Sequence, residues 1–386
     1  MEGNEAMFVC QECLGDPMLK GFKSLLTSEV ICVACSRSTR EALTPSRIAS
    51  FIRKHLKTHF AVDDGLYEGY ELTLAQVVSI AIRCDNLLVC EAIAQEMVNP
   101  QADEEDFYWP GQEYCVAPSP FESEEHERWW VVGEWNNIAH ELNHDRRFFN
   151  DNARLFFDSL IYEALNAEYA ECPGTPAVIK LLPSGTSFYR ARIAKDEAEA
   201  RHFIKNPPDE LGAAPIEHAK SNRMSAAGVS LLYVAQDTKT CIHEVQPPKG
   251  ATVVVGQFTS TSPLTIFDFN ALSHQLKHTP LSLFSPDFQK RSDHRRLLQY
   301  LHEEIARPVE LLDTHYVVTQ ALAECIRYNK QQAFDGISFR SVQHEGGINF
   351  VLFDKGNSQS MQAPGGRLKF GLNISSDAVT THHITE

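Results

Sequence analysis

The sequence predicts an α+β protein in which a cysteine-rich start and a helical first half precede a mixed sheet with inserted helices. Apolar residues recur at helical spacing between residues 45 and 171. From residue 182 onward the pattern changes to short runs rich in β-branched and aromatic residues, separated by turn residues and a few helical stretches. Strands and helices that do not alternate regularly are typical of α+β proteins and not of a parallel sheet with regular crossovers.

Length and composition limit the classes of protein to which the chain can belong. Its 386 residues predict two or three domains, and 43% hydrophobic with 22% charged residues exclude a disordered, collagenous or coiled-coil protein. The formal net charge of −16 disfavours nucleic acid as a partner. There is no apolar run of the roughly 18 residues that a membrane span needs, and residues 1–21 lack the pattern of a signal peptide. We therefore expect a soluble, cytoplasmic protein without a membrane partner.

Four of the ten cysteines form two CxxC pairs near the start of the chain, Cys10 with Cys13 and Cys32 with Cys35. Each pair can turn two thiolates toward one ion, and two pairs complete a tetrahedral site. The spacing predicts a structural zinc ion in a segment of residues 1–44. Four sulfur ligands leave no open position for catalysis. The alternatives are two unrelated pairs of buried thiols, or a redox CxxC, which the second copy disfavours.

The second predicted domain, residues 45–171, is helical. Residues 73–98 are predicted to form a helix with one apolar stripe, made of Leu74, Val77, Val78, Ala81 and Leu88. A second predicted helix has the stripe Phe149, Ala153, Phe156, Leu160 and Ala164. Three tryptophans are predicted to pack between helices, namely Trp129, Trp130 and Trp135. Residues 99–127 are rich in Pro, Glu and Asp and predict a long solvated connection. Arg53 and His59 have the spacing of the RNase signature in HEPN domains, but a solvated basic face is the preferred interpretation.

The third predicted domain covers residues 182–386 and follows a predicted linker at 172–176. Strands are expected at 186–191, 229–235, 252–258, 264–269, 336–340 and 348–353. Helices are expected at 196–205, 238–245, 286–306 and 314–330.

Charged residues in this third domain form a candidate site. Arg190 and Arg192 are two apart in a predicted strand and therefore share a face, where two guanidiniums suit either solvent or a polyanion such as a diphosphate. Arg223 lies in a loop of small residues before an apolar strand. Glu244 lies near the end of a helix with apolar neighbours, where an acid needs a partner or a ligand. A buried ion network of these residues is the alternative.

Five polar positions occur in an order and spacing that resemble the RES domain, which is named for its arginine, glutamate and serine: Arg190, Arg223, Tyr233, Glu244 and Ser341. The likeness covers roughly residues 182–353, and the preceding part of the chain resembles the HEPN/RES N-terminal domain. The resemblance implies an ADP-ribosyltransferase-like fold and degradation of NAD⁺ by phosphorolysis or hydrolysis. It also implies a toxin held by an antitoxin or another regulatory protein, and we expect a homo-oligomer.

The resemblance also implies roles for individual residues. Arg190 and Arg223 would hold the diphosphate of NAD⁺, Tyr233 would pack beside the nicotinamide, and Glu244 would lie at the nicotinamide ribose. Ser341 would bind the substrate or orient the glutamate.

Two further residues complete the predicted binding set. Asn349 is a candidate NAD⁺ contact, and Arg192 is a second candidate for the first arginine of the family pattern. The chain departs from that pattern around Arg223, because Asn222 precedes it where the family has glycine, and Met224 and Ser225 follow it where the family has an aromatic residue and asparagine.

The chemistry of nicotinamide release suits these residue types. Cleavage of the bond builds positive charge at ribose C1′, so a carboxylate beside the ribose favours the transition state. Nicotinamide is a cationic leaving group that needs no acid, which agrees with one glutamate instead of two carboxylates. Water or phosphate then accepts the ribosyl group. The alternatives are transfer of ADP-ribose to a macromolecule, and a zinc-ribbon adaptor that binds a nucleotide without reacting.

Overall fold

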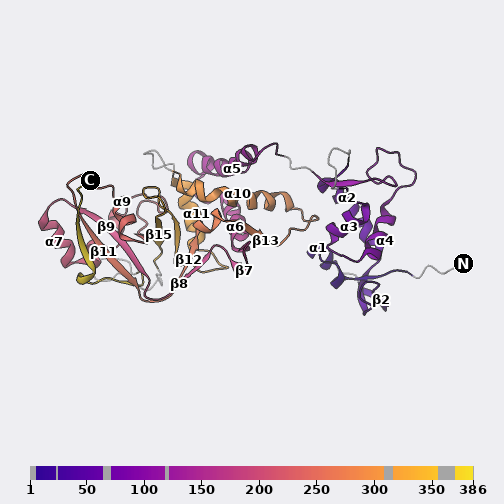
Figure 1. Cartoon of the computed structure of the whole chain (residues 1–386), viewed down its shortest axis with the longest axis horizontal. Helices are drawn as coiled ribbons and strands as arrows, with labels where there is room; N and C mark the ends of the chain where they lie inside the picture. The colour runs from indigo at the N-terminus through magenta and orange to yellow at the C-terminus, as the bar shows by residue number, and fades with distance from the viewer. Residues whose placement is uncertain are drawn as a thin grey trace. The chain divides into compact units, whose positions relative to one another are not determined.

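The computed structural model describes residues 6–22, 25–63, 71–117, 121–307, 316–354 and 370–385 (Figure 1). The chain divides into two compact units. The first consists of Met1–Glu124 and Pro280–Ser292, and the second of Glu125–Thr279 and Asp293–Glu386. Within the described ranges, none of the helices combines the length and the apolar character that crossing a membrane requires.

The first unit combines a small sheet with a group of helices. Its antiparallel sheet has the order β1-β3-β2, and a separate pair joins β4 to β5. The bounds are β1 (Val9–Cys10), α1 (Pro17–Lys20), β2 (Leu25–Ile31), β3 (Ser38–Leu43), α2 (Pro45–His59), β4 (Phe60–Val62), α3 (Leu74–Ile82), α4 (Leu87–Met97) and β5 (Tyr114–Val116). Helix α2 begins where the Thr44 side chain accepts a hydrogen bond from the backbone N–H of Arg47, with Pro45 in the first turn.

A distant segment of the chain completes the first unit. Phe284 is buried in the same core as α2, α3 and α4. The Ser282 hydroxyl donates to the buried carboxylate of Asp16 at 3.0 Å, and the Arg83 guanidinium donates to the carbonyl of Leu281 at 2.6 Å. These contacts explain why residues 280–292 group with the first unit although they follow most of the second in sequence.

The second unit is built on a large mixed sheet of nine described strands. The order is β16-β11-β9-β10-β15-β14-β12-β8, with β17 also paired to β11. Strands β12 and β14 are parallel and the other pairs are antiparallel. The bounds are β8 (Ile179–Leu182), β9 (Ser187–Ala194), β10 (Leu232–Ala235), β11 (Thr252–Ser260), β12 (Leu264–Asp268), β14 (Gly336–Arg340), β15 (Ile348–Leu352), β16 (Leu372–Asn373) and β17 (Val379–His383).

The helices that accompany this sheet are α5 (Glu124–His140), α6 (Asp151–Leu165), α7 (Glu197–Lys205), α8 (Pro207–Glu210), α9 (Thr238–Glu244), α10 (Phe288–Ala306) and α11 (Val317–Arg327). Helices α5 and α6 precede the strands of this sheet, and the helices from α7 to α11 are inserted between them, as the sequence predicts for the third domain. Helix α9 packs on β9 (Figure 1). The eleven helices of the described residues and the large mixed sheet confirm the predicted mixture of helices and strands.

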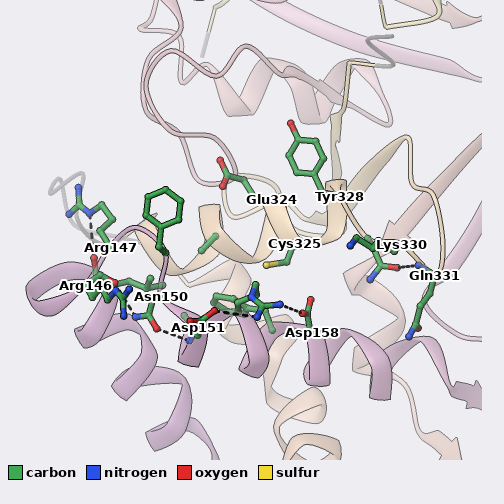
Figure 2. A pocket seen from close by; sticks show the side chains of 17 residues that line it. Arg146, Arg147, Asn150, Asp151, Asp158, Glu324, Cys325, Tyr328, Lys330 and Gln331 are labelled. Atoms are coloured by element: carbon green, nitrogen blue, oxygen red, sulfur yellow. Dashed lines mark hydrogen bonds and ion pairs between the residues drawn. The ribbon is translucent and has the colours of Figure 1, made fainter. Parts of the chain in front are cut away.

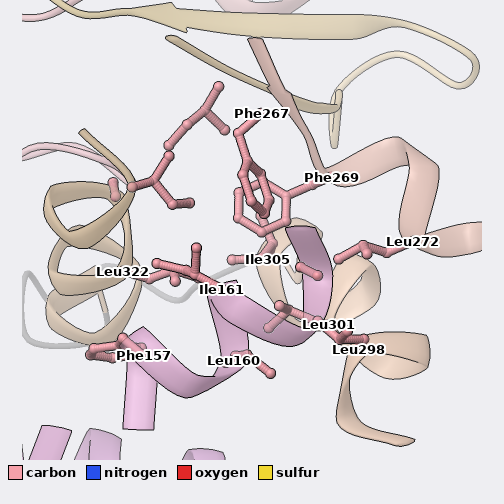
Figure 3. Close-up of a cluster of buried hydrophobic side chains, with 14 of the residues drawn as sticks. Phe157, Leu160, Ile161, Phe267, Phe269, Leu272, Leu298, Leu301, Ile305 and Leu322 are labelled. Carbon is pink, nitrogen blue, oxygen red and sulfur yellow. The ribbon is translucent and has the colours of Figure 1, made fainter. Parts of the chain in front are cut away.

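The largest core of the second unit joins helices α6, α10 and α11 to the sheet (Figure 3). Phe157, Leu160 and Ile161 of α6 lie within this core together with Leu301 of α10 and Phe267 of β12. Helix α6 therefore belongs to the same folding unit as the sheet. The predicted division into residues 1–44, 45–171 and 182–386 stays a prediction, while the compact units are divided at residue 124.

Several local predictions are wrong. Residues 73–98 form two helices and not one, because Arg83 takes a left-handed conformation (φ 55°) that ends α3. Leu88 is 62% exposed, since the break changes the face that α4 buries. The connection at 99–127 is not wholly solvated, because Phe107, Tyr108 and Tyr114 are buried in the first unit's core.

Two predictions for aromatic residues of the second unit also fail. Trp135 is buried as predicted, but Trp129 and Trp130 are 72% and 55% exposed because they lie on another face of α5. Phe149 precedes α6 and is 91% exposed.

The predicted linker at 172–176 is a strand instead. It is β7 (Cys172–Pro176), which pairs with β6 (Ala167–Tyr169), and β6 in turn pairs with β13 (Leu276–His278).

Candidate active site

One pocket of the second unit, of about 590 Å³, gathers most of the predicted site residues. Strands β9, β10, β14 and β15, helix α9 and nearby loops line it. The predicted residues among its lining are Arg190, Arg223, Tyr233, Glu244 and Asn349. Residues that are more than 150 positions apart in sequence thus meet at one place.

Glu244 is the last residue of α9. This helix begins at Asp237, whose side chain accepts a hydrogen bond from the backbone N–H of Thr240 at 2.8 Å. The Oε1 atom of Glu244 accepts hydrogen bonds from the Ser341 hydroxyl at 2.5 Å and from the Asn349 side-chain amide at 2.7 Å. Both bonds fall on the same oxygen, and Oε2 accepts none from the residues that the structure describes.

The direction of the Ser341 hydrogen bond follows from its other contacts. Its side-chain oxygen accepts from the backbone N–H groups of Gln343 at 3.2 Å and His344 at 3.0 Å. A hydroxyl has one proton and two lone pairs, so the proton of Ser341 is directed to Glu244. Ser341 is 5% exposed and is not among the residues that line the pocket. It therefore supports the carboxylate from behind.

Arg190 lies on β9 with a buried Nη1 atom that has no hydrogen-bond partner among the described residues. Burial, together with the nearby charge of Arg192, lowers the pKa of Arg190 to about 10, while Tyr233 opposes this shift. The guanidinium is still charged at neutral pH. A buried donor without a partner is costly in a folded protein and often marks the position of a ligand.

Arg192 has different surroundings. It lies 3.7 Å from the carboxylate of Glu210 on α8 and 6.0 Å from the centre of the Phe203 ring on α7. It is not among the residues that line the pocket. The sequence did not decide between Arg190 and Arg192 as the first arginine of the family pattern, and of the two only Arg190 lines the pocket.

Arg223 lies in the turn between Asn222 and Ser225. One of its guanidinium nitrogens, Nη1, donates to the carbonyls of Ile305 and of Arg307, the latter at 3.0 Å. These carbonyls are at the C-terminal end of α10, where the helix dipole favours a cation. Burial lowers the pKa of Arg223, while Tyr316, Glu244 and Tyr233 oppose this shift.

Tyr233 joins the Arg223 loop to the sheet. Its phenolic oxygen is 2.9 Å from the hydroxyl of Ser225 and accepts from the backbone N–H of Met224 at 3.2 Å. Burial raises the pKa of Tyr233 to about 12, so the phenol stays protonated at neutral pH. The hydroxyl thus holds the loop while the side chain lines the pocket.

Sequence reasoning missed aromatic residues of the pocket. Tyr189, Tyr316 and Phe339 contribute to its lining, and the Tyr316 ring lies 5.6 Å from the Arg223 guanidinium. Tyr316 lies directly before α11, so only its place at the start of a predicted helix could have drawn attention to it.

A second pocket of about 880 Å³ lies between α6, α11 and the loops beside them (Figure 2). Its charged groups are partly paired with each other, since Arg154 lies 3.2 Å from Asp151 and 3.8 Å from Asp158. None of the predicted site residues lines it. The smaller pocket is therefore the candidate active site.

The first unit contains a candidate metal centre. The sulfur atoms of Cys10, Cys13, Cys32 and Cys35 all lie within 4.8 Å of one another. The separations are 3.5 Å between Cys10 and Cys13, 3.6 Å between Cys10 and Cys35, and 3.9 Å between Cys13 and Cys32. Four sulfurs about 2.3 Å from a tetrahedral zinc ion would be about 3.8 Å apart. The cluster could therefore hold such an ion.

Comparison with known proteins gives one match. Residues 188–371 match the family model of the RES domain, and no curated protein or solved structure matches the chain. All the predicted site residues of the second unit lie within the matched range. RES domains are linked to NAD-related toxin–antitoxin systems. The resemblance of the upstream residues to a HEPN-type domain stays a prediction. The family match thus identifies residues 188–371 as a RES domain.

Proposed function

We propose that the candidate active site binds NAD⁺ and cleaves its nicotinamide–ribose bond, with phosphate or water as the acceptor. One observation carries this proposal. A glutamate held by two donors on one oxygen shares a pocket with a half-buried arginine, Arg190, whose buried Nη1 atom has no hydrogen-bond partner among the described residues. An anion-binding group beside a fixed carboxylate suits a substrate with a diphosphate at one end and a reacting ribose at the other.

The residues divide the work between binding and bond cleavage. Arg190 and the remaining donors of Arg223 bind the diphosphate oxygens. Tyr233 and Tyr316 provide ring surface for the substrate. Glu244 directs its second carboxylate oxygen, Oε2, to the hydroxyls of the nicotinamide ribose.

The reaction proceeds by transfer of the ribosyl group from nitrogen to oxygen. The bond between C1′ and the nicotinamide nitrogen breaks, its electron pair stays on nitrogen, and neutral nicotinamide leaves. The carboxylate of Glu244 stabilises the positive charge that develops on the ribose. An oxygen of water or phosphate then forms a bond to C1′. With water, the products are ADP-ribose, nicotinamide and one proton.

The proposal extends to the fold, the metal and the biological role. The sheet with inserted helices would be ADP-ribosyltransferase-like, the four cysteines would hold a structural zinc ion, and depletion of NAD⁺ would make the protein a toxin that a partner restrains. A zinc ion on four sulfurs would stabilise the first unit and take no part in the reaction.

Product analysis tests the activity. The purified chain is incubated with NAD⁺, with and without inorganic phosphate, and the products are identified by mass. ADP-ribose 1″-phosphate indicates phosphorolysis, and ADP-ribose indicates hydrolysis. Adenine-labelled NAD⁺ that leaves its label on a protein indicates transfer to a macromolecule. NAD⁺ that binds but stays intact in both conditions contradicts the proposed reaction and favours a binding module.

A further inference from the structure

The loop from Ser341 to Gly347 lies along helix α9 and is bound to it at two places. At the end of the helix, Ser341 donates to Glu244. Nearer its start, Nδ1 of His344 lies 2.9 Å from the hydroxyl oxygen of Thr240. The backbone at Gly347 approaches the same threonine so closely that a Cβ there would lie 2.7 Å from its side-chain atoms. Only glycine allows this approach without a shift of the loop or the helix.

The hydrogen bonds at the start of the helix have a defined direction. The Thr240 hydroxyl lies 2.8 Å from the carboxylate of Asp237. Burial raises the pKa of Asp237, but hydrogen bonds from Thr240 and the nearby His344 outweigh it and hold the pKa below its usual value. The carboxylate is therefore ionised and can only accept. The single proton of Thr240 is directed to Asp237, so Thr240 accepts from Nδ1–H of His344.

The chain of hydrogen bonds continues from His344 to the candidate catalytic carboxylate. The backbone N–H of His344 donates to Ser341, and Ser341 donates to Glu244. Thr240 is fully buried and Ser341 is 5% exposed, so water does not compete freely at either hydroxyl. The ring of His344 also stacks on that of His243 at 4.9 Å with an angle of 3° between the planes. His243, which directly precedes Glu244 on α9, thus gives the loop a further contact with the helix.

We propose that Thr240 and His344 are positioning residues for Glu244. They anchor the loop on α9 and so place the Ser341 hydroxyl where it occupies Oε1. This leaves Oε2 free and correctly turned toward the substrate. Neither residue lines the pocket, so neither touches the substrate directly. The inference rests on the proposed function, in which Glu244 carries the reaction.

The test uses matched pairs of variants in the full chain. Thr240→Val keeps the shape and removes the hydroxyl, whereas Thr240→Ser keeps the hydroxyl. His344→Phe removes the Nδ1–H donor, whereas His344→Asn retains an amide donor near the position of Nδ1. We expect Thr240→Val and His344→Phe to lower kcat for NAD⁺ cleavage at least about tenfold with KM changed less than about twofold. Thr240→Ser and His344→Asn should keep most of the wild-type kcat.

Melting temperatures of all four variants separate this role from a merely structural one. Loss of kcat in the folded Val and Phe variants, with rescue by Ser and Asn, supports the proposal. Wild-type kcat in Thr240→Val or His344→Phe overturns it. Equal loss in both members of a pair also overturns it, because the hydroxyl or the donor would then have no special part.

A measurement that needs no turnover keeps the inference separate from the proposed function. Nitrogen chemical shifts report which ring nitrogen of His344 carries the proton. We expect the Nδ1–H form at neutral pH in wild-type protein and its loss in Thr240→Val. The Nε2–H form in wild type overturns the proposed hydrogen-bond chain. Absence of NAD⁺ cleavage by the wild type, with the Nδ1–H form present, contradicts the proposed function alone.

Discussion

Arg190 and Arg192 are chemically identical and two residues apart, yet the structure gives them different surroundings. Arg192 lies beside the carboxylate of Glu210, whereas the buried Nη1 atom of Arg190 has no hydrogen-bond partner within the part of the chain that the structure describes. A buried charge without a partner lowers stability, and proteins keep such groups mainly where function requires them. The buried Nη1 atom of Arg190 is thus expected both to lower the stability of the fold and to bind the substrate.

Arg190→Met tests this relation. We expect KM for NAD⁺ to rise by about tenfold or more because a diphosphate contact is lost, while the melting temperature stays equal to or rises above that of the wild type. Steady-state kinetics and thermal unfolding provide the two readouts. Arg192→Met is the matched control and should leave KM nearly unchanged. A normal KM in Arg190→Met would show that this arginine does not bind the substrate.

Glu244→Gln tests the carboxylate itself. The amide oxygen can still accept from Ser341 and Asn349, so the fold and substrate binding should be retained. The charge that meets the cationic transition state is lost, and we expect kcat to fall by about 10² to 10⁴. Glu345→Gln, at an exposed position of the neighbouring loop, is the control. Unchanged turnover in Glu244→Gln would refute the assignment.

Strand β1, the turn after it and the loop after β2 bring the four cysteines of the first unit together. Cys10 ends β1, Cys13 ends a 3₁₀ turn, and Cys32 directly follows β2. Pairing of both strands with β3 holds these chain segments beside each other. The small sheet therefore has its sulfur cluster where a metal ion would fasten one strand to the next.

Replacement of Cys10 and Cys13 by serine should remove zinc and loosen the first unit, because two of four thiolates are lost. Elemental analysis should give one zinc ion per wild-type chain and almost none in the double variant, with faster proteolysis near the N-terminus. Cys172→Ser, at an exposed cysteine, should keep the metal. Metal-free wild-type protein prepared without chelator would contradict this prediction.

Strand β13 contains a histidine whose burial makes stability depend on pH. Burial, together with the nearby charge of Arg295, lowers the pKa of His278 to about 4, while Glu163 opposes this shift. The Nδ1 atom has no hydrogen-bond partner among the described residues. In the unfolded chain the pKa is about 6.5. Between these values the unfolded chain binds a proton that the folded protein does not, so stability falls as the pH decreases from about 6.5 to about 4.

His278→Gln should reduce this dependence. We expect the urea midpoint of the second unit to fall less between about pH 7 and about pH 5 in the variant than in wild type, whatever the midpoint at pH 7. His218→Gln, at an exposed histidine, is the control. Equal slopes in His278→Gln and wild type would show that this imidazole does not control the acid response.

The two compact units of the molecule are interleaved along the chain. Residues 280–292 complete the first unit, and helix α6 lies in the main core of the second. The family match begins at residue 188, well after α6. The family match at residues 188–371 therefore covers only part of the second unit, whose main core also contains α6.

Truncation tests this difference. A chain of residues 182–386 lacks the buried α6 side chains Phe156, Phe157, Leu160 and Ile161. At about 2 kcal/mol for each such side chain, their loss is comparable to the whole stability of a typical domain. We expect this fragment to aggregate and a fragment of residues 125–386 to be more soluble, as soluble yield and thermal unfolding would show. Cooperative unfolding of residues 182–386 would contradict this expectation.

Local pattern in the sequence determined where several elements lie and which residue types form the site. The strand at 336–340 was predicted with its observed bounds, and the CxxC spacing indicated a cysteine cluster that the structure contains. These features depend on neighbours in sequence, because periodicity and ligand spacing are local properties.

Only the tertiary structure decided which of two arginines lines the pocket, which face α4 buries, and which unit takes α6 and residues 280–292. It also showed that Ser341 stands behind Glu244 and that His344 and Thr240 join the loop to α9. Apart from the face that α4 buries, which the break at Arg83 sets, these features depend on contacts between residues that are roughly a hundred or more positions apart. Sequence pattern carries no direct record of such contacts, because the same arginine or serine suits solvent, an ion pair or a ligand until the fold supplies its surroundings.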